Sequence, residues 1–175
     1  RKAALEGIAE LRRRYPDDLR VAYRQFPLPI HASADSAARA AVAADRQGQF
    51  WPFADKLLAA PRLGRQTYVQ IARELGLDEP RFLTDFDSAE VAKVVRDDLV
   101  YARRLGLDAT PAIFVNGRYI SGFRGTEELA ADVDAELAHA RQRIAAGVAR
   151  DAVAREILER EAIPPSEFPS ADLQQ

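Results

Sequence analysis

Few residues in this chain of 175 could carry out chemistry by themselves. It contains two histidines, His31 and His139, and no cysteine. An imidazole has an ordinary pKa of about 6.5, so His31 is a candidate for moving a proton, although a histidine in such a segment more often caps or packs a loop. A Ser-His-Asp triad built from Ser36, His31 and Asp35 would join sequence neighbours in an expected helix cap. The sequence therefore does not predict a hydrolase of that type.

Metal and cofactor chemistry is not indicated either. Structural zinc is held mainly by cysteine and histidine, which are absent or scarce here. The acidic residues show no spacing typical of a metal cage, and there is no glycine-rich phosphate loop. The sequence predicts no metal site and no cofactor.

The most specialised backbone segment is Thr110–Gly117, which reads Thr-Pro-Ala-Ile-Phe-Val-Asn-Gly. Proline lacks an amide hydrogen and suits the first residue of a strand, and an X-Pro bond is the common place for a cis peptide. Asn-Gly tolerates the positive φ values of a type I′ turn. The segment predicts a hairpin with strands at 112–115 and 118–121, entered through Pro111. An ordinary hairpin behind a trans proline remains open on this segment alone.

Composition bounds the remaining possibilities. The chain is 47% hydrophobic and 30% charged, which fits one globular domain with a sizeable core. A net charge of -2 gives no electrostatic reason to expect nucleic acid or an anionic membrane as a partner. No apolar run approaches the roughly 20 residues that span a bilayer, so we expect a soluble domain. The absence of methionine indicates that sequence precedes Arg1, and any secretory signal would lie there.

Hydrophobic spacing predicts a mostly helical protein with a small sheet. A helix is expected from the start of the chain to Tyr15, followed by a strand over 19–24 with Leu19, Val21 and Tyr23 on one face. Helical patterns then follow in a long block, in which Asp87–Glu90 resembles a capping box that starts a helix closed by Gly106. After the hairpin, the pattern predicts a long helix that covers the sheet through Leu129, Val133, Leu137, Ala140 and Ile144. A final helical segment contains Val153 and Ile157, and Pro164–Pro165 opens a tail that we expect to be mobile.

The order helix, strand, helical block, hairpin and helix resembles the DsbA-like thiol-disulfide oxidoreductases. The most specific matching segments are Val21–His31, Gln47–Trp51, Arg104–Pro111 and Phe114–Gly122. The resemblance implies an α/β thioredoxin-like fold interrupted by a helical insertion. We assign residues 1–31 and 107–146 to the thioredoxin-like domain, 32–106 to the insertion, and 147–175 to a C-terminal helical extension with its tail.

The chain departs from that family at its beginning. There, a central strand and a Cys-x-x-Cys pair precede the first helix, immediately before the position of Arg1, and both are absent from this sequence. The central strand would pair between the strand at 19–24 and the strand at 112–115. We expect upstream sequence, or alternatively a swapped strand from another chain, to supply it, because buried backbone groups need hydrogen-bond partners.

The resemblance also assigns roles to individual residues. A cis Thr110–Pro111 bond would lie in the loop that receives the substrate's extended backbone. Arg1 and Lys2 oppose the helix dipole, but next to a thiolate they would lower its pKa; two basic residues at an exposed end need have no such role. His31 is a further candidate near the redox pair. Trp51, with Phe50 and Phe53, could line a peptide groove, although such a stripe is usually core.

Three functions follow from the resemblance. The first is a thiol-disulfide oxidoreductase that acts on protein or peptide thiols and disulfides, works with a redox partner protein, and has its cysteines upstream of this chain. The second is a thioredoxin-fold module without redox residues that binds peptides or serves as a scaffold. The third is an enzyme like the kappa-class glutathione transferases, which share the interrupted fold and use a serine. The resemblance implies a bacterial periplasmic or other extracytoplasmic location.

Overall fold

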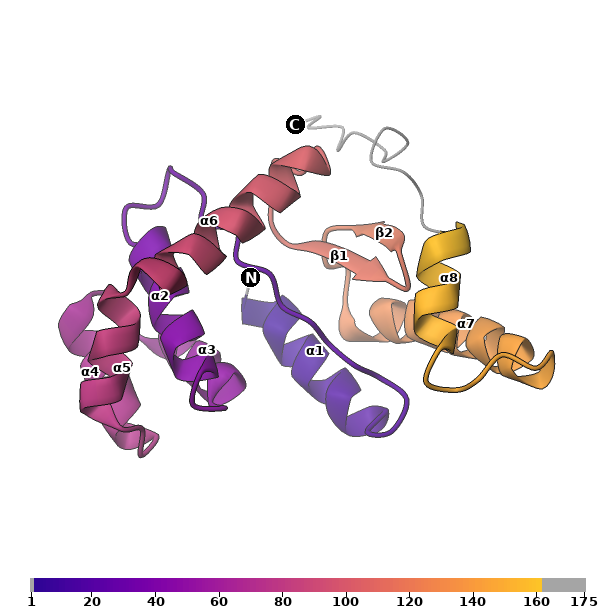
Figure 1. Ribbon diagram of the computed structural model, residues 1–175, viewed down its shortest axis with the longest axis horizontal. Helices are drawn as coiled ribbons and strands as arrows, with labels where there is room; N and C mark the ends of the chain where they lie inside the picture. The colour runs from indigo at the N-terminus through magenta and orange to yellow at the C-terminus, as the bar shows by residue number, and fades with distance from the viewer. Residues whose placement is uncertain (1, 162–175) are drawn as a thin grey trace. The chain divides into compact units, whose positions relative to one another are not determined.

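The chain forms two compact units. The computed structural model describes residues 2–161, and Figure 1 shows its helices and strands. Unit 1 contains residues 1–22 and 104–175, and unit 2 contains residues 23–103. Arg1 and the Pro164–Pro165 tail expected from the sequence lie outside the described residues.

Unit 1 is built on a β-hairpin. Strands β1 (Ala112–Val115) and β2 (Arg118–Ser121) pair antiparallel, with Ile113 opposite Ile120. Asn116 has φ 47° and Gly117 has φ 86°, the left-handed values that the Asn-Gly sequence accommodates in a two-residue turn. The hairpin expected over 112–121 is therefore present with its expected turn.

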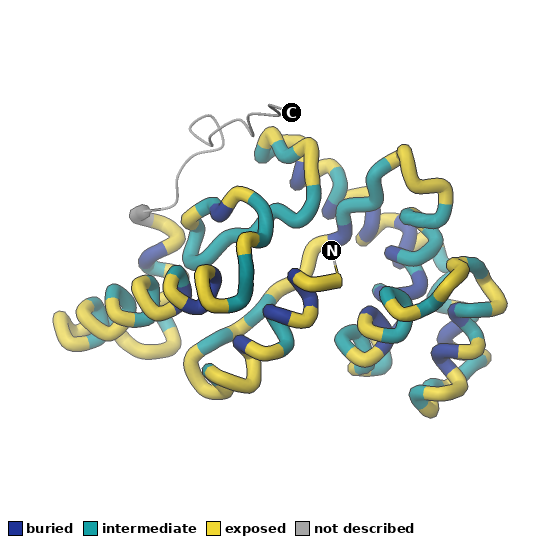
Figure 2. Tube along the Cα trace, turned by 180° about the vertical axis from the view of Figure 1, so that it is seen from behind, coloured by how far each residue is buried: buried dark blue, intermediate teal, exposed yellow. Residues whose placement is uncertain are grey.

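Helices α1 (Lys2–Arg14) and α7 (Thr126–Ala145) pack against one face of this hairpin. Side chains alternate between the two faces of a strand, so Ile113 and Val115 point to the same side. Both join the apolar cluster of unit 1, whose buried members are Leu11, Leu129, Ala130 and Val133. The hairpin itself is mostly half-buried, as Figure 2 shows.

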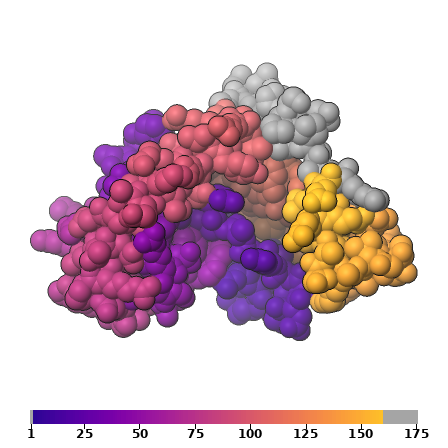
Figure 3. Space-filling model, viewed as in Figure 1, coloured from indigo at the N-terminus to yellow at the C-terminus, as the bar shows by residue number. Residues whose placement is uncertain are grey.

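The second half of α7 packs differently from the expectation. Its apolar residues were predicted to continue over the sheet, but the cluster on the hairpin takes only residues from the first half of the helix. The second half contacts α8 (Val153–Glu161), as Figure 3 shows, and Arg143 of α7 donates a hydrogen bond to Glu156 of α8. Helix α8 contributes the buried Val153 and Ile157. Helical spacing identifies an apolar face but does not identify the element that covers it.

The strand expected over 19–24 is not formed. Residues 19–28 have no regular secondary structure, and within residues 2–161 the sheet contains only β1 and β2. A strand exists only as part of a hydrogen-bonded ladder, and the central strand expected to pair with 19–24 is not among the described residues. Alternation of Leu19, Val21 and Tyr23 is thus not sufficient to form a strand.

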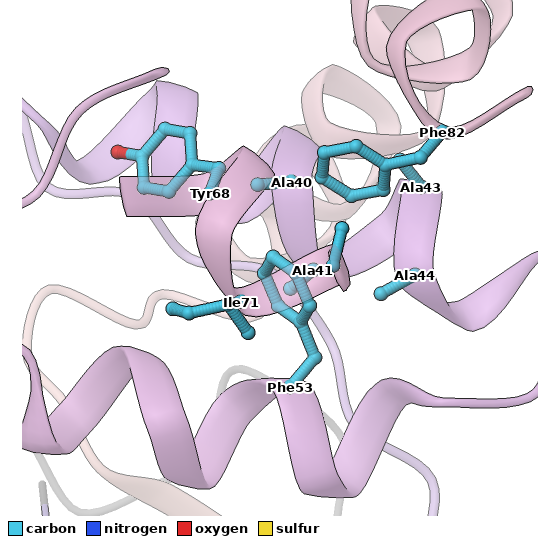
Figure 4. Close-up of a cluster of buried hydrophobic side chains, with 9 residues drawn as sticks. Ala40, Ala41, Ala43, Ala44, Phe53, Tyr68, Ile71 and Phe82 are labelled. Atoms are coloured by element: carbon cyan, nitrogen blue, oxygen red, sulfur yellow. The ribbon is translucent and has the colours of Figure 1, made fainter. Parts of the chain in front are cut away.

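Unit 2 is helical and has its own core. Its helices are α2 (Ala34–Asp45), α3 (Phe50–Ala59), α4 (Arg65–Glu74), α5 (Glu79–Asp87) and α6 (Ala89–Arg104), the last residue of which belongs to unit 1. Alanines on α2 let neighbouring helices approach closely, and Phe53, Tyr68, Ile71 and Phe82 pack around them (Figure 4). The rings of Phe53 and Phe82 lie 5.5 Å apart.

Two helix starts in unit 2 differ from the sequence interpretation. Helix α5 was not predicted, although Asp78 caps it by accepting a hydrogen bond from the Arg81 amide at 2.9 Å. The cap of α6 is Ser88, whose Oγ accepts from the Val91 amide at 3.1 Å, rather than the predicted Asp87. Asp87 instead ends α5 and forms two hydrogen bonds with Arg65, each 2.7 Å long.

Close packing at Gly7 fixes α1 in unit 1. A Cβ atom at this position would lie 2.7 Å from Cζ of Phe123 and 2.9 Å from Oγ1 of Thr126. Gly7→Ala should lower the free energy of unfolding by about 1 kcal/mol, because overpacking of about 1–3 kcal/mol exceeds the gain in helix propensity of about 1 kcal/mol. Denaturant unfolding of the purified protein measures this change.

A double-mutant cycle isolates the clash at Gly7. Phe123→Leu removes the ring atoms that a new Cβ would meet, so Gly7→Ala should cost less in this background than in the wild type. Equal costs in both backgrounds would show that the Phe123 ring does not restrict Gly7.

Candidate functional site

The site begins with the two residues that lead into β1. The Thr110–Pro111 peptide bond is cis. Both residues are half-buried, and Pro111 directly precedes the first residue of β1. Proline at this position removes a backbone donor where the ladder has not yet begun. The chain therefore presents an accessible, conformationally restricted loop at the entry to the hairpin.

Helix α1 is the second part of the site. Lys2 is its first residue and forms an exposed ion pair with Glu6 at 3.9 Å. Figure 1 shows that the start of α1 and the entry to β1 lie toward the same end of unit 1. The amide groups at the start of a helix favour a nearby negative charge, such as a thiolate.

Polar contacts fix the other end of α1 onto α7. Arg14 Nη1 lies 3.3 Å from a carboxylate oxygen of Glu127, and the Tyr15 hydroxyl donates a 2.6 Å hydrogen bond to Asp134. Together with the apolar contact of Leu11, they join the end of α1 to the first half of α7. The position of the first turn of α1 thus depends on contacts made by its last turn.

His31 belongs to unit 2, whereas Thr110, Pro111 and Lys2 belong to unit 1. Its side chain is exposed, and its backbone forms a turn before α2: the His31 amide donates to the Leu28 carbonyl at 3.0 Å, and its own carbonyl accepts from the Ala34 amide at 2.9 Å. His31 therefore contributes its backbone to a turn, while its side chain is exposed. Arg1 lies outside the described residues.

The aromatic residues around Trp51 divide into two groups. Phe53 is fully buried in the core of unit 2. Trp51 and Phe50 are half-buried instead and form a ring cluster with Tyr23, which is 37% exposed. The stripe expected from the sequence thus supplies the core with one ring and the surface of unit 2 with the other two.

The sequence analysis did not identify Asp98, a buried carboxylate of α6. It is 5% exposed and accepts hydrogen bonds from Arg24 and from the Gln25 amide, each 2.8 Å long. A signal was available, because Asp98 falls within the helical stripe of Val91, Val95 and Ala102. A lone carboxylate in an apolar stripe must be paired when it is buried.

Within residues 2–161, no three histidine or acidic side chains come together as metal ligands. None of the described helices has the length and apolarity needed to cross a bilayer.

The pKa of Tyr15 provides a test of the contact between α1 and α7. The hydrogen bond to Asp134 raises this pKa above its ordinary value, because the neutral phenol is the donor. A raised folded-state pKa contributes stability that is fully present below about pH 10 and is lost as the pH rises through the folded-state value. Unfolding measured from about pH 8 to pH 11 should show this loss in the wild type, and Tyr15→Phe should not show it.

A matched variant tests the partner of Tyr15. Asp134→Asn keeps an acceptor but removes the charge, so it should weaken the pH dependence without abolishing the hydrogen bond. If wild type and Tyr15→Phe lose stability in parallel over this range, the contact does not contribute to holding α1.

Comparison with known proteins gives the chain its relatives. A sequence profile of the thioredoxin family matches residues 1–135. A thioredoxin-like oxidoreductase from Silicibacter pomeroyi has 29% sequence identity and a TM-score of 0.64, covering 78% of this chain and 80% of that structure. DsbA from Xylella fastidiosa has 22% identity and a TM-score of 0.61, covering 81% of each chain, which supports the fold.

Other relatives of this chain are named as sodium–proton antiporters. The Na(+)/H(+) antiporter NhaA of Herminiimonas arsenicoxydans is 43% identical over 114 residues, which are 65% of this chain and 18% of that protein. Na(+)/H(+) antiporter NhaA 1 of Mycolicibacterium vanbaalenii is 38% identical over 118 residues, 65% of this chain and 19% of that protein. The chain spans about a fifth of the length of these relatives.

Proposed function

This chain belongs to the thioredoxin family, in its DsbA-like form, and on that premise we propose that it provides the scaffold of a thiol-disulfide oxidoreductase. The α/β thioredoxin-like fold expected from the sequence is confirmed by these relationships. The proposed reaction needs a Cys-x-x-Cys pair, which we place in the sequence immediately before Arg1. In this arrangement the first cysteine precedes α1, and Thr110–Pro111 lies at the entry to the hairpin.

The proposed exchange proceeds in two balanced steps. A thiolate at the start of α1 attacks one sulfur of a substrate disulfide, so that a mixed disulfide forms and the other substrate sulfur leaves as a thiolate and takes up a proton. The second cysteine then attacks the mixed disulfide, forms the enzyme disulfide and releases the second substrate thiol. Two electrons pass from the enzyme dithiol to the substrate, and the reverse sequence oxidises a substrate dithiol.

Residues of this chain support the first step. The helix N-terminus and the positive charge of Lys2 would lower the pKa of an adjacent thiol and thereby increase the fraction of thiolate. The observation that carries the proposal is the position of Thr110 and Pro111 at the entry to β1, where an extended substrate backbone could align with the hairpin.

The second edge of β1 supports an additional strand. Within residues 2–161 the sheet order is β1–β2, so only one edge of β1 has a strand beside it. We propose that upstream sequence supplies a strand on the other edge, next to the segment at 19–24. Hydrogen exchange of residues 112–115 in polypeptides with and without the upstream segment measures this, and equal protection in both would contradict it.

The absence of cysteine favours one alternative, a thioredoxin-fold module that binds extended peptides without redox chemistry.

The names of the relatives support a proposal about the natural polypeptide. We propose that this domain is joined there to a sodium–proton antiporter, and that its redox site lies in an extracytoplasmic compartment. Membrane fractionation of the natural polypeptide, with alkylation by a membrane-impermeant thiol reagent, would test both parts. Recovery of the polypeptide in the soluble fraction would contradict the fusion to an antiporter. Thiols that stay unmodified in intact cells would contradict an extracytoplasmic redox site.

A variant at Thr110 tests the enzymatic proposal. In the polypeptide that includes the upstream sequence, Thr110→Arg should lower kcat/KM for a disulfide-containing peptide by about tenfold, about 1.4 kcal/mol, because the larger side chain obstructs the peptide at the entry to β1. Disulfide exchange monitored by peptide fluorescence measures this rate.

Two comparisons complete this test. Asp108→Arg places the same side chain on an exposed residue of the same loop and should leave the rate near that of the wild type. No exchange by the wild-type polypeptide would refute the oxidoreductase proposal and favour the binding module, and equal rates for both arginine variants would remove Thr110 from the substrate site.

A further inference from the structure

The chain passes between its two units twice. The first connection lies between Ala22 and Tyr23, and the second lies between Arg103 and Arg104. These positions are about eighty residues apart in sequence, yet the unit 2 residues next to them contact one another. The contact involves Arg24 and Gln25 next to the first connection and Asp98 and Tyr101 next to the second, and we call these four residues the junction clamp.

Asp98 is the centre of the junction clamp. Its side chain is 7% exposed, and its two oxygens have different partners: Oδ1 accepts from Nη1 of Arg24 and Oδ2 accepts from the Gln25 amide, both at 2.8 Å. Gln25 is also buried, with 7% exposure. Charge-assisted hydrogen bonds of this kind are directional, so one carboxylate fixes both the position and the orientation of the segment at 24–25.

Arg24 makes a second contact with the same helix. Its guanidinium lies 5.6 Å from the centre of the Tyr101 ring, one turn after Asp98 on α6. The Arg24 side chain is 69% exposed, so its contacts with Asp98 and with the Tyr101 ring, rather than burial, determine where the guanidinium lies. Arg24 therefore joins the start of unit 2 to the last turn of α6, immediately before the chain returns to unit 1.

An apolar residue at position 98 would suit the stripe of α6, whose neighbouring buried positions are Val91, Val95 and Ala102. A carboxylate there has a desolvation cost that only its partners offset. Both partners come from the segment that enters unit 2, and neither comes from the core cluster of unit 2. The contact thus acts on the connections rather than on the packing of the core.

We propose that the junction clamp holds the two connections together at their unit 2 ends, so that the segment at 23–25 and the last turn of α6 open together. Without the clamp, the segment at 23–25 and the last turn of α6 would open independently. This inference does not depend on the oxidoreductase activity, because it concerns the connections alone.

Amide hydrogen exchange, followed by NMR on the purified protein, tests the proposal. Asp98→Asn keeps the shape of the side chain but removes its charge. We expect exchange at residues 23–25 to increase at least tenfold and exchange at residues 102–104 to increase at least threefold, while amides of α2 and α4 keep their wild-type rates. Faster exchange at both connections after the loss of this one charge is the result expected if the two connections share the clamp.

A matched control distinguishes the loss of the junction clamp from the loss of another ion pair in unit 2. Asp85 has a side chain that is 14% exposed and pairs with Arg46 at 2.6 Å, away from both connections in the sequence. Asp85→Asn should leave exchange at residues 23–25 and 102–104 unchanged. An equal increase at the connections in this control would overturn the proposal, because it would show a general weakening of unit 2.

Arg24→Gln provides an independent variant. It leaves the bond between Asp98 and the Gln25 amide in place but removes the guanidinium that contacts both Asp98 and Tyr101, so it should reproduce the faster exchange at 102–104. Faster exchange at 23–25 alone, in both Asp98→Asn and Arg24→Gln, would overturn the proposal by showing that Asp98 anchors one segment only. A uniform increase throughout unit 2 would overturn it as well.

Discussion

The apolar contact between α1 and α7 over one face of the hairpin is the interaction on which unit 1 depends. A two-stranded hairpin has too little buried area to be stable by itself, and its apolar face must be covered. Leu11 from α1 and Leu129 and Val133 from α7 provide this cover. Because Gly7 brings α1 close to Phe123, the same packing also fixes where the first turn of α1 lies, and so determines where a thiolate before α1 would be held.

Unit 2 is stabilised independently of that packing. Its core consists of alanines on α2 surrounded by aromatic and aliphatic residues of α3, α4 and α5, and none of these comes from unit 1. The entry loop at Thr110–Pro111 and the helical unit therefore have separate sources of stability. Substitutions in the core of unit 2 need not disturb the hairpin.

Local chemistry made part of this structure predictable from the sequence. Pro111 and Asn116–Gly117 have restricted backbone conformations, and they marked the hairpin correctly. The alternation at 19–24 was misleading because the ladder partner of a strand is not encoded within the strand itself. The apolar residues of α7 likewise did not indicate that α8 would cover half of them, and the role of Asp98 depends on residues more than seventy positions away.

The intact mass of the natural polypeptide, measured with and without thiol alkylation, tests the central claim most directly. The proposed redox pair predicts the addition of two alkyl groups after reduction and none when the protein is oxidised, with both modified residues mapping immediately before Arg1. A polypeptide that takes up no alkyl group after reduction would contradict the oxidoreductase proposal. The hairpin and α1 would then form a peptide-binding scaffold without thiol chemistry.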